Sequence, residues 1–220
     1  SIIEKNISHE TLIEDVSLLP HIGEDNYDTV HYQNWCYVST GKGDTIEKKL
    51  GDGQTTCHFL KKEFMKERNL IDNLGKDEEP LGIVPAVLKH LLDARNATKK
   101  RMKKEPNEFK KKVLDGLQLA YKVTANSVYG QLGAKTSTIY KMKLAACTTS
   151  VGRSRIDDAS FGVKDWAEMK GYPEPDVIYG DTDSVFVKFS RIKDGQTLVG
   201  KEALKHCIQC GREAGDYITN

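Results

Sequence analysis

Long apolar runs, a signal-peptide pattern and an internal repeat are all missing from this 220-residue sequence. A membrane-spanning helix needs roughly 20 consecutive, mostly apolar residues, and no stretch of the chain approaches that length. Without a secretory leader or an anchor, we expect a soluble intracellular protein that does not enter a membrane. The chain opens directly on Ser1-Ile-Ile, with no polar lead-in. We therefore also expect it to be a fragment of a longer protein.

The sequence also lacks the cysteine pattern of a small secreted protein. Its five cysteines are odd in number and unevenly spaced, which does not fit a disulfide framework. Cys207 and Cys210 have the spacing of a zinc or redox motif, but no second such pair exists. They also share one face of a helix with Ala203, Ala214 and Tyr217. We therefore favour buried core cysteines over a metal site.

A large excess of one charge is missing too, because the net charge is only +1. Residues 99–112 nevertheless hold eight basic residues against two acids. The basic residues are Lys99, Lys100, Arg101, Lys103, Lys104, Lys110, Lys111 and Lys112, and the acids are Glu105 and Glu108. A basic block inside a near-neutral chain favours a local contact with a polyanion. The alternative is the solvated tip of a helical hairpin.

Apolar periodicity predicts such a hairpin. A helical stripe begins near Pro85, which suits a first helical turn. Its members are Val84, Val87, Leu88, Leu91 and Leu92. Arg95 and Lys99 continue the stripe, so we expect these cations to enter a cleft. Pro106 interrupts the pattern, and a second helix is predicted from about Asn107 to Tyr129, antiparallel to the first.

On the second predicted helix, Lys122, Asn126 and Tyr129 share one face at i, i+4 and i+7. Gly130 follows and either ends the helix or lets a ligand approach closely. A triphosphate carries about four negative charges near neutral pH and needs both metal and side-chain cations. Arg95, Lys99 and Lys122 could supply those cations. The alternatives are a snorkelling surface lysine for Lys122 and a helix-end cap for Asn126.

The remaining elements are predicted from local signals. Residues 32–38 and 56–59 fit a hairpin, and residues 69–80 fit a loop. A third helix is expected over about 144–170, ending at Gly171-Tyr-Pro. A second hairpin covers residues 177–189, with Val185, Val187 and Phe189 on one face and Phe186 on the other. The last helix starts at about Gly200.

The turn of that second hairpin carries two carboxylates two residues apart, those of Asp181 and Asp183. Oxygen ligands between flanking apolar strands favour a hard divalent cation such as magnesium, and such a metal serves phosphoryl transfer. An EF-hand calcium loop is excluded, because Val185, Phe186 and Ile192 occupy the positions of a ligand, the glycine and the glutamate. A plain turn with two solvated aspartates remains the alternative.

These motifs resemble those of family B DNA polymerases. Tyr179-Gly-Asp-Thr-Asp-Ser184 is similar to the family's metal-binding palm motif. Lys122-Val-Thr-Ala-Asn-Ser-Val-Tyr-Gly130 is similar to its fingers motif, and the two stand in the family's order and separation. Further similar stretches begin at Asn6, at Gly82 and at Ala146. The resemblance covers nearly the whole chain and is weakest from Gly23 to Glu79.

The resemblance implies a role for each matching residue. Asp183 is a direct ligand of the catalytic metals, two Mg²⁺ ions, and Asp181 is a nearby, less essential acid. The incoming triphosphate is held by Arg95, Lys99, Lys122 and Asn126. Tyr129 and Gly130 pack against the nascent base pair. The family's first palm motif, which carries the other metal-binding aspartate, is missing, so we expect the fragment alone to be inactive.

The implied fold is α/β: a partial palm, with an antiparallel sheet and helices, plus a two-helix antiparallel fingers hairpin. We expect a palm segment with an insert over residues 1–82, the fingers hairpin over 83–131 and the palm continuation over 132–220. The implied partners are primer–template DNA and deoxynucleoside triphosphates, with a sliding clamp reached through regions absent here. The expected location is the nucleus or a viral replication site in host cytoplasm. One alternative is a non-catalytic nucleic-acid-binding relative, against which the paired acids argue. The other is a reverse transcriptase, against which the fingers motif argues.

Overall fold

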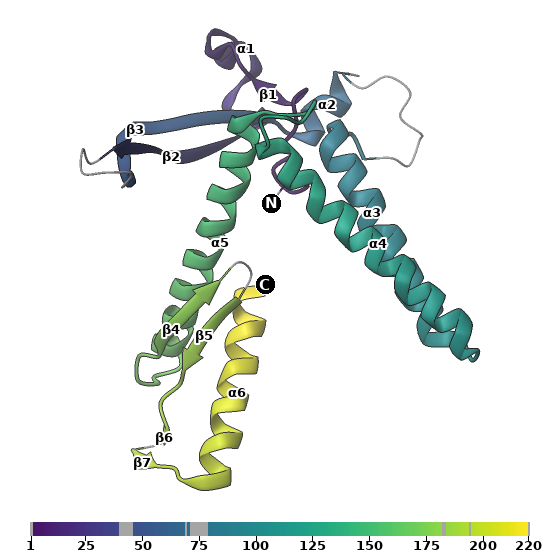
Figure 1. Cartoon of the computed structure of the whole chain (residues 1–220). Helices are drawn as coiled ribbons and strands as arrows, with labels where there is room; N and C mark the ends of the chain where they lie inside the picture. The colour runs from purple at the N-terminus through teal and green to yellow at the C-terminus, as the bar shows by residue number, and fades with distance from the viewer. Residues whose placement is uncertain are drawn as a thin grey trace. The chain divides into compact units, whose positions relative to one another are not determined.

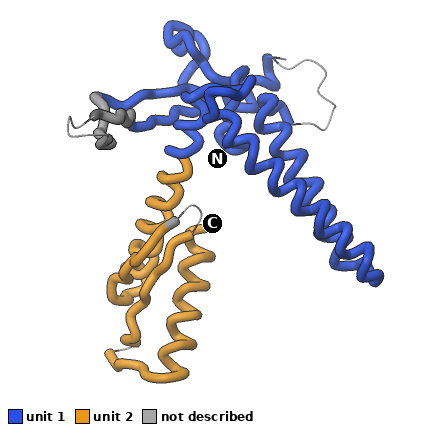
Figure 2. Tube along the Cα trace, viewed as in Figure 1, with its two compact units in different colours: residues 1–150 blue, residues 151–220 orange. Residues whose placement is uncertain are grey.

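The computed structural model describes residues 2–39, 46–68, 70, 79–181, 184–193 and 195–219, without the side chains of residues 34–39, 46–52 and 181. The chain separates into two compact units, residues 1–150 and 151–220 (Figure 2). Its mixture of helices and small antiparallel sheets confirms the predicted α/β class (Figure 1). The predicted division at residues 82 and 131 stays a prediction. None of the described helices is long and apolar enough to cross a membrane.

A long antiparallel hairpin forms the sheet of unit 1. Strands β2 (Tyr27–Ser39) and β3 (Ile46–Leu60) pair with each other, and β1 (Leu12–Ile13) pairs with the other edge of β3. The hairpin predicted from residues 32–38 and 56–59 is confirmed, with longer strands than expected. Most of the predicted 69–80 loop lies outside the described residues. Short helices flank the sheet: η1 (Val16–Leu18), α1 (Leu19–Ile22), η2 (Glu24–Asn26) and α2 (Lys62–Glu67).

The N-terminal segment holds the start of α3 (Ile83–Lys104). The first amides of a helix lack partners within it. Here the backbone amide of Gly82 donates to Asn6 Oδ1 at 2.8 Å, and that of Val84 donates to Ser8 Oγ at 3.3 Å. A Cβ atom on Gly82 would lie 2.5 Å from the Ser8 Cβ. Only glycine therefore lets the two segments approach this closely, and the base of the helical hairpin is fixed to the N-terminal segment.

Helix α3 and helix α4 (Glu108–Gly133) form the predicted antiparallel hairpin. Figure 1 shows them side by side, with the turn between them extending away from the rest of unit 1. Asn107 caps α4, since its side chain accepts a hydrogen bond from the Lys110 amide at 3.1 Å. The predicted stripe on α3 is too broad: Val84 and Leu88 are buried, but Val87 and Leu92 are 46% and 40% exposed. The packed face of α3 is therefore narrower than the apolar stripe in its sequence.

Of the two roles predicted for Gly130, that of ending the second helix is wrong. Helix α4 continues to Gly133, and Ala134 is its C-cap. A glycine inside a helix costs only about 1 kcal/mol relative to alanine, and Leu132 is completely buried in the turn that follows. Burial of Leu132 offsets this cost, and the helix continues past Gly130. Asn126 consequently lies inside the helix, which excludes its alternative role as a helix-end cap.

Unit 2 contains a hairpin and helices at the predicted positions. Helix α5 (Met142–Met169) begins in unit 1 and ends in unit 2, where Gly171 takes a φ of +70°. Strands β4 (Asp176–Asp181) and β5 (Ser184–Lys188) pair antiparallel, and α6 spans Gly200–Thr219. A small ladder joins β6 (Ile192–Lys193) and β7 (Gln196–Thr197).

An aromatic cluster forms the core of unit 2. Trp166 of α5 is buried with Ala167, and Cys210 and Ala214 of α6 complete the cluster. Phe189 packs on Trp166 edge to face, with ring centroids 5.9 Å apart. Along β5 the predicted alternation is confirmed: Val185, Val187 and the following Phe189 are half-buried, whereas Phe186 is 61% exposed.

Candidate functional site

The two candidate metal-binding acids belong to the β4–β5 turn of unit 2. The backbone of Asp181 occupies the last paired position of β4, opposite Ser184. Asp183 and the side chain of Asp181 lie outside the described residues. The structure thus places the backbone of Asp181 at a tight strand end, and the metal-ligand role of both acids stays a prediction.

Gly180 lets this strand end approach helix α5. A Cβ atom at position 180 would lie 3.0 Å from Ile156 Cγ2, which is closer than ordinary van der Waals contact. The next atoms, on Val185 and Ser184, would be at 3.6 and 3.8 Å. A side chain at position 180 would therefore need Ile156 to give by a few tenths of an ångström, and Ile156 lies against the strand just before the turn.

The donor chemistry of the turn suits a hard cation. Magnesium and calcium take oxygen ligands, and carboxylates are the commonest protein source of them. Within the described part of the chain, no group of three or more His, Cys, Asp or Glu side chains is arranged to hold a metal ion. Two aspartates would therefore need further oxygen ligands to complete the coordination of a metal.

The candidate phosphate-binding residues belong to the α3–α4 hairpin of unit 1. Arg95 is half-buried, and its Nε donates a hydrogen bond to Gln118 Oε1 across the hairpin at 3.2 Å. Gln118 Nε2 donates in turn to Asp115 Oδ1 at 3.0 Å. Gln118 was not among the predicted residues. Its position four residues before Lys122, on the same helix face, was the available signal.

Lys99 and Lys122 stand one turn from this contact. Lys99 follows Arg95 by four residues on α3, and Lys122 follows Gln118 by four residues on α4. Because the helices are antiparallel, the two lysines lie on opposite sides of Arg95 along the hairpin axis, each displaced by about 6 Å. Both are exposed, and neither forms an ion pair with any described residue. Asn126 is exposed one turn beyond Lys122.

Tyr129 is tied to helix α5 within unit 1. Its hydroxyl lies 2.7 Å from Thr149 Oγ1. Because the Thr149 hydroxyl donates to the Ala145 carbonyl at 3.0 Å, Tyr129 is the donor in this pair. Gly130 is exposed, and a Cβ atom there would meet no described atom within 4 Å. The open surface at Gly130 agrees with the predicted close approach of a ligand but does not test it.

Cys210 is a core residue, as predicted, whereas Cys207 beside it is only partly buried. Cys57, Cys147 and Cys210 are buried, and Cys207 is half-buried. A hydrogen bond between the Cys57 and Cys147 thiols lowers the pKa of Cys57 to about 7, against the opposing effect of burial, and raises that of Cys147. The side chain of Cys36 lies outside the described residues.

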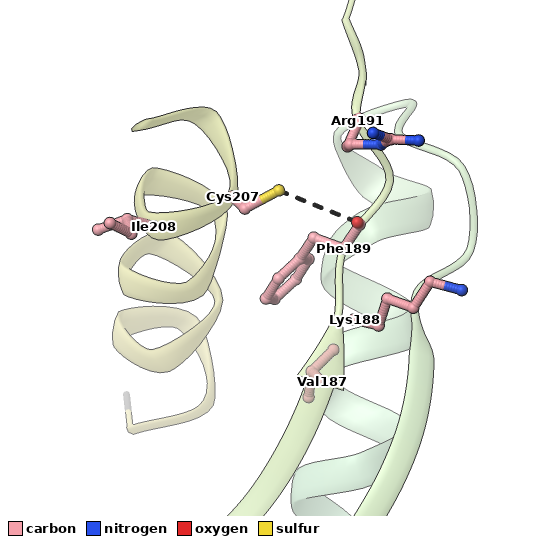
Figure 3. Close-up of a pocket in the computed structure, with 6 residues that line it drawn as sticks. All are labelled: Val187, Lys188, Phe189, Arg191, Cys207 and Ile208. Carbon is pink, nitrogen blue, oxygen red and sulfur yellow. Dashed lines mark hydrogen bonds between the residues drawn. The ribbon is translucent and has the colours of Figure 1, made fainter. Parts of the chain in front are cut away.

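A pocket of about 410 Å³ lies between β5 and α6 in unit 2 (Figure 3). The Cys207 thiol points toward the Phe189 carbonyl oxygen, 4.0 Å away. In the same view Lys188 and Arg191 point away from α6, and so do not converge on this contact. The pocket brings together none of the predicted site residues.

Comparison with known proteins gives a consistent result. The family model for DNA polymerase family B matches residues 1–210. The DNA polymerase of Phaeocystis pouchetii virus is 35% identical, over 100% of this chain and 22% of its own length. That of Pyramimonas orientalis virus is 33% identical, over 98% of this chain and 19% of its own length. The DNA polymerase delta catalytic subunit of Candida albicans is 41% identical, over 63% of this chain and 12% of its own length.

The viral matches extend over nearly all of this chain, which itself spans about a fifth of each viral polymerase. The family match includes both the helical hairpin and the acidic turn. This chain belongs to DNA polymerase family B.

Proposed function

We propose that the intact protein is a DNA-directed DNA polymerase that adds deoxynucleoside triphosphates to a primer 3′ end, and that this chain is its palm and fingers segment. Family membership supports DNA synthesis in general. The observation that carries the finer proposal is the Arg95–Gln118 contact, which brings a cation of α3 within one turn of Lys122 on α4.

In this proposal Arg95, Lys99, Lys122 and Asn126 bind the triphosphate of the incoming nucleotide. Charge-assisted hydrogen bonds to phosphate oxygens are stronger than those between neutral groups. Arg95 is held by Gln118 through Nε alone among the described contacts, which leaves its terminal amino groups for phosphate. Lys99 and Lys122 extend the row of cations to either side of it.

Helix periodicity supports a common edge of the hairpin for Lys99 and Lys122. The half-buried positions of α4 that face α3 recur at Leu114, Gln118, Tyr121 and Ala125. At 3.6 residues per turn, Lys122 and Lys99 each lie roughly 60–70° from the packed face of their own helix, rotated toward higher residue numbers. Seen from one end of the hairpin, increasing residue number rotates one helix clockwise and its antiparallel partner counterclockwise. Because the two packed faces point at each other, both rotations carry the lysines toward the same edge of the hairpin.

Asp183 and Asp181 are proposed to hold the two catalytic magnesium ions, together with an acid of the family's first palm motif. Magnesium held there would supply Lewis acidity to the primer 3′-hydroxyl and to the leaving pyrophosphate. This chain contributes carboxylate oxygens at the end of a strand supported by Ile156. Since that first motif is missing from the sequence, the chain alone is proposed to be inactive.

Tyr129 and Gly130 are proposed to pack against the nascent base pair. The hydrogen bond to Thr149 fixes the Tyr129 ring, and Gly130 presents no side chain to the pair. Closure of the fingers around a correct pair would then select the nucleotide by induced fit. The proposed partners are primer–template DNA and a sliding clamp, at an intracellular site of replication in the nucleus or in virus-infected cytoplasm.

A carboxylate exchange in the intact polymerase tests the metal-binding role. Asp183→Asn should abolish primer extension while leaving affinity for primer–template unchanged, because the amide keeps the shape but loses the charge that binds the metal. Asp176→Asn is the matched control: it changes an exposed aspartate of the same hairpin that pairs with Lys188 at 3.4 Å. Extension is measured on a labelled primer. Substantial extension by Asp183→Asn would remove Asp183 from the metal site.

A further inference from the structure

The basic charge of this chain is concentrated at the end of the α3–α4 hairpin. We define the hairpin tip as residues 100–112. Of the 33 basic and 32 acidic residues in the whole chain, seven and two lie in the tip, so the rest of the chain is net acidic. The basic residues of the tip are Lys100, Arg101, Lys103, Lys104, Lys110, Lys111 and Lys112. Such segregation exceeds what solubility needs and is typical of a surface that binds a polyanion.

The charges of the hairpin tip are available to a partner. All seven basic residues are exposed. Across the described residues, Lys111 is the only one of them with an ion pair, to Glu108 at 3.4 Å. The carboxylate of Glu105 accepts a hydrogen bond from the Asn107 backbone amide at 3.1 Å instead. The tip therefore carries a net positive charge that its own acids do not neutralise.

An exposed aromatic ring stands among these cations. Phe109 is 76% exposed, the largest exposed fraction of any large hydrophobic side chain in the described parts of the chain. It lies in the first turn of α4, directly before Lys110, Lys111 and Lys112. A ring at this level of exposure contributes little to the core. Cations interleaved with an open aromatic face are the composition of a single-stranded nucleic-acid surface, where bases stack on the ring.

The hairpin tip is separate from the proposed triphosphate site. Phe109 and Lys122 are 13 residues apart on one continuous helix, which corresponds to about 20 Å along its axis. A nucleotide bound at Lys122 is too short to reach the tip, but a strand of DNA is long enough. Duplex DNA keeps its base faces stacked inside, so a ring that binds by stacking favours unpaired bases.

We propose that the hairpin tip binds single-stranded DNA, namely the unpaired template ahead of the incorporation site. The lysines and Arg101 contact its phosphates, and a template base stacks on Phe109. The identity of the strand as template rests on the proposed function. The single-strand affinity of the tip does not, because it follows from the exposed ring and the charges alone.

The test uses the intact polymerase and two fluorescent primer–templates with the same duplex. One has a one-nucleotide template overhang, and the other an overhang of about 12 nucleotides, within the range of single-strand site sizes. Phe109→Ala should weaken binding of the long-overhang DNA by roughly fivefold or more, the equivalent of the ~1 kcal/mol lower bound for base stacking. Binding of the short-overhang DNA should not change. Val113→Ala, an exposed apolar residue one turn further along α4, is the matched control.

The charge contribution is tested by replacing Lys110, Lys111 and Lys112 together with glutamine. The slope of log affinity against log salt for the long-overhang DNA should decrease by up to about 2, since each single-strand phosphate contact contributes ~0.7. Two results would overturn the proposal: long-overhang binding equal to wild type in both variants, or an equal loss on the short-overhang DNA, which would place the contact on duplex. Extension of the short-overhang primer by every variant shows that each is folded. Its absence in the wild type would instead contradict the proposed polymerase function.

Discussion

The orientations of Arg95 and Tyr129 are set by side chains on other helices. Gln118 on α4 accepts the hydrogen bond from Arg95, and Thr149 on α5 accepts the one from Tyr129. Each contact removes rotamer freedom from a long side chain before any ligand binds, which lowers the entropic cost of binding. Gln118 and Thr149 would therefore orient residues of the proposed nucleotide site without touching the nucleotide.

The hydrogen bond between the Tyr129 and Thr149 hydroxyls can be tested by removing either hydroxyl. In the intact polymerase, Tyr129→Phe and Thr149→Val each remove the same hydrogen bond. Because a net hydrogen bond is worth about 0.5–1.5 kcal/mol, each should raise the KM for the incoming nucleotide by roughly two- to tenfold. The double variant should be no worse than either single one, as measured by steady-state incorporation. Fully additive effects would show that the two hydroxyls act independently.

Periodicity within one helix was sufficient to predict the row of Lys122, Asn126 and Tyr129, because neighbours on a helix face follow from local sequence alone. Periodicity could have placed Gln118 on the face of Lys122, but it could not have predicted that Gln118 contacts Arg95 or that Thr149 contacts Tyr129. Their contacts depend on the register between successive helices, and packing sets that register. Gly130 shows the converse limit: its local preference to end a helix was overridden by burial of Leu132 in the next turn.

At the scale of elements, close approaches at glycines position the main parts of each unit. Gly82 lets the N-terminal segment bind the start of α3, and Gly180 lets β4 lie against α5. The sequence predicted the two longer hairpins and the four long helices, since alternation and apolar spacing are local, but not β1, β6, β7 or the short helices. It did not predict that Gly82 would face the side chain of Ser8, or that Gly180 would face the side chain of Ile156.

Gly180→Ala tests the support of the acidic turn. The added methyl would lie 3.0 Å from Ile156 Cγ2, so either the Ile156 side chain or the strand end must give by a few tenths of an ångström, and a shift of the strand end would carry Asp181 with it. We expect a loss of roughly tenfold or more in the rate of primer extension, since misplacement by ~1 Å can cost about 100-fold. Adding Ile156→Ala to the same protein should restore part of the rate.

Ile156→Ala alone is the control for that experiment, because it removes the facing methyl without adding one to the strand. Rates are compared by single-turnover extension of a labelled primer. If Gly180→Ala extends at the wild-type rate, or if the second change restores nothing, the contact with Ile156 does not position the turn.

At the scale of the whole molecule, charge and chemistry are distributed unevenly. The part of the hairpin between its base and the hairpin tip carries Arg95, Lys99 and Lys122 at spaced intervals. The hairpin tip carries a dense group of lysines and an exposed ring. This arrangement suits two anionic ligands of different length on one pair of helices. The acidic turn belongs to the other compact unit.

The most direct test of the central claim, that the hairpin binds the incoming triphosphate, is a nucleotide titration of single-turnover incorporation by the intact polymerase. Lys122→Ala should raise the apparent Kd for the nucleotide by about tenfold or more, because a hydrogen bond to a charged group is worth about 1.5–3 kcal/mol. Affinity for primer–template should not change. Lys135→Ala, an exposed lysine just beyond α4, should match the wild type. An unchanged nucleotide Kd in Lys122→Ala would mean that Lys122 does not bind the triphosphate.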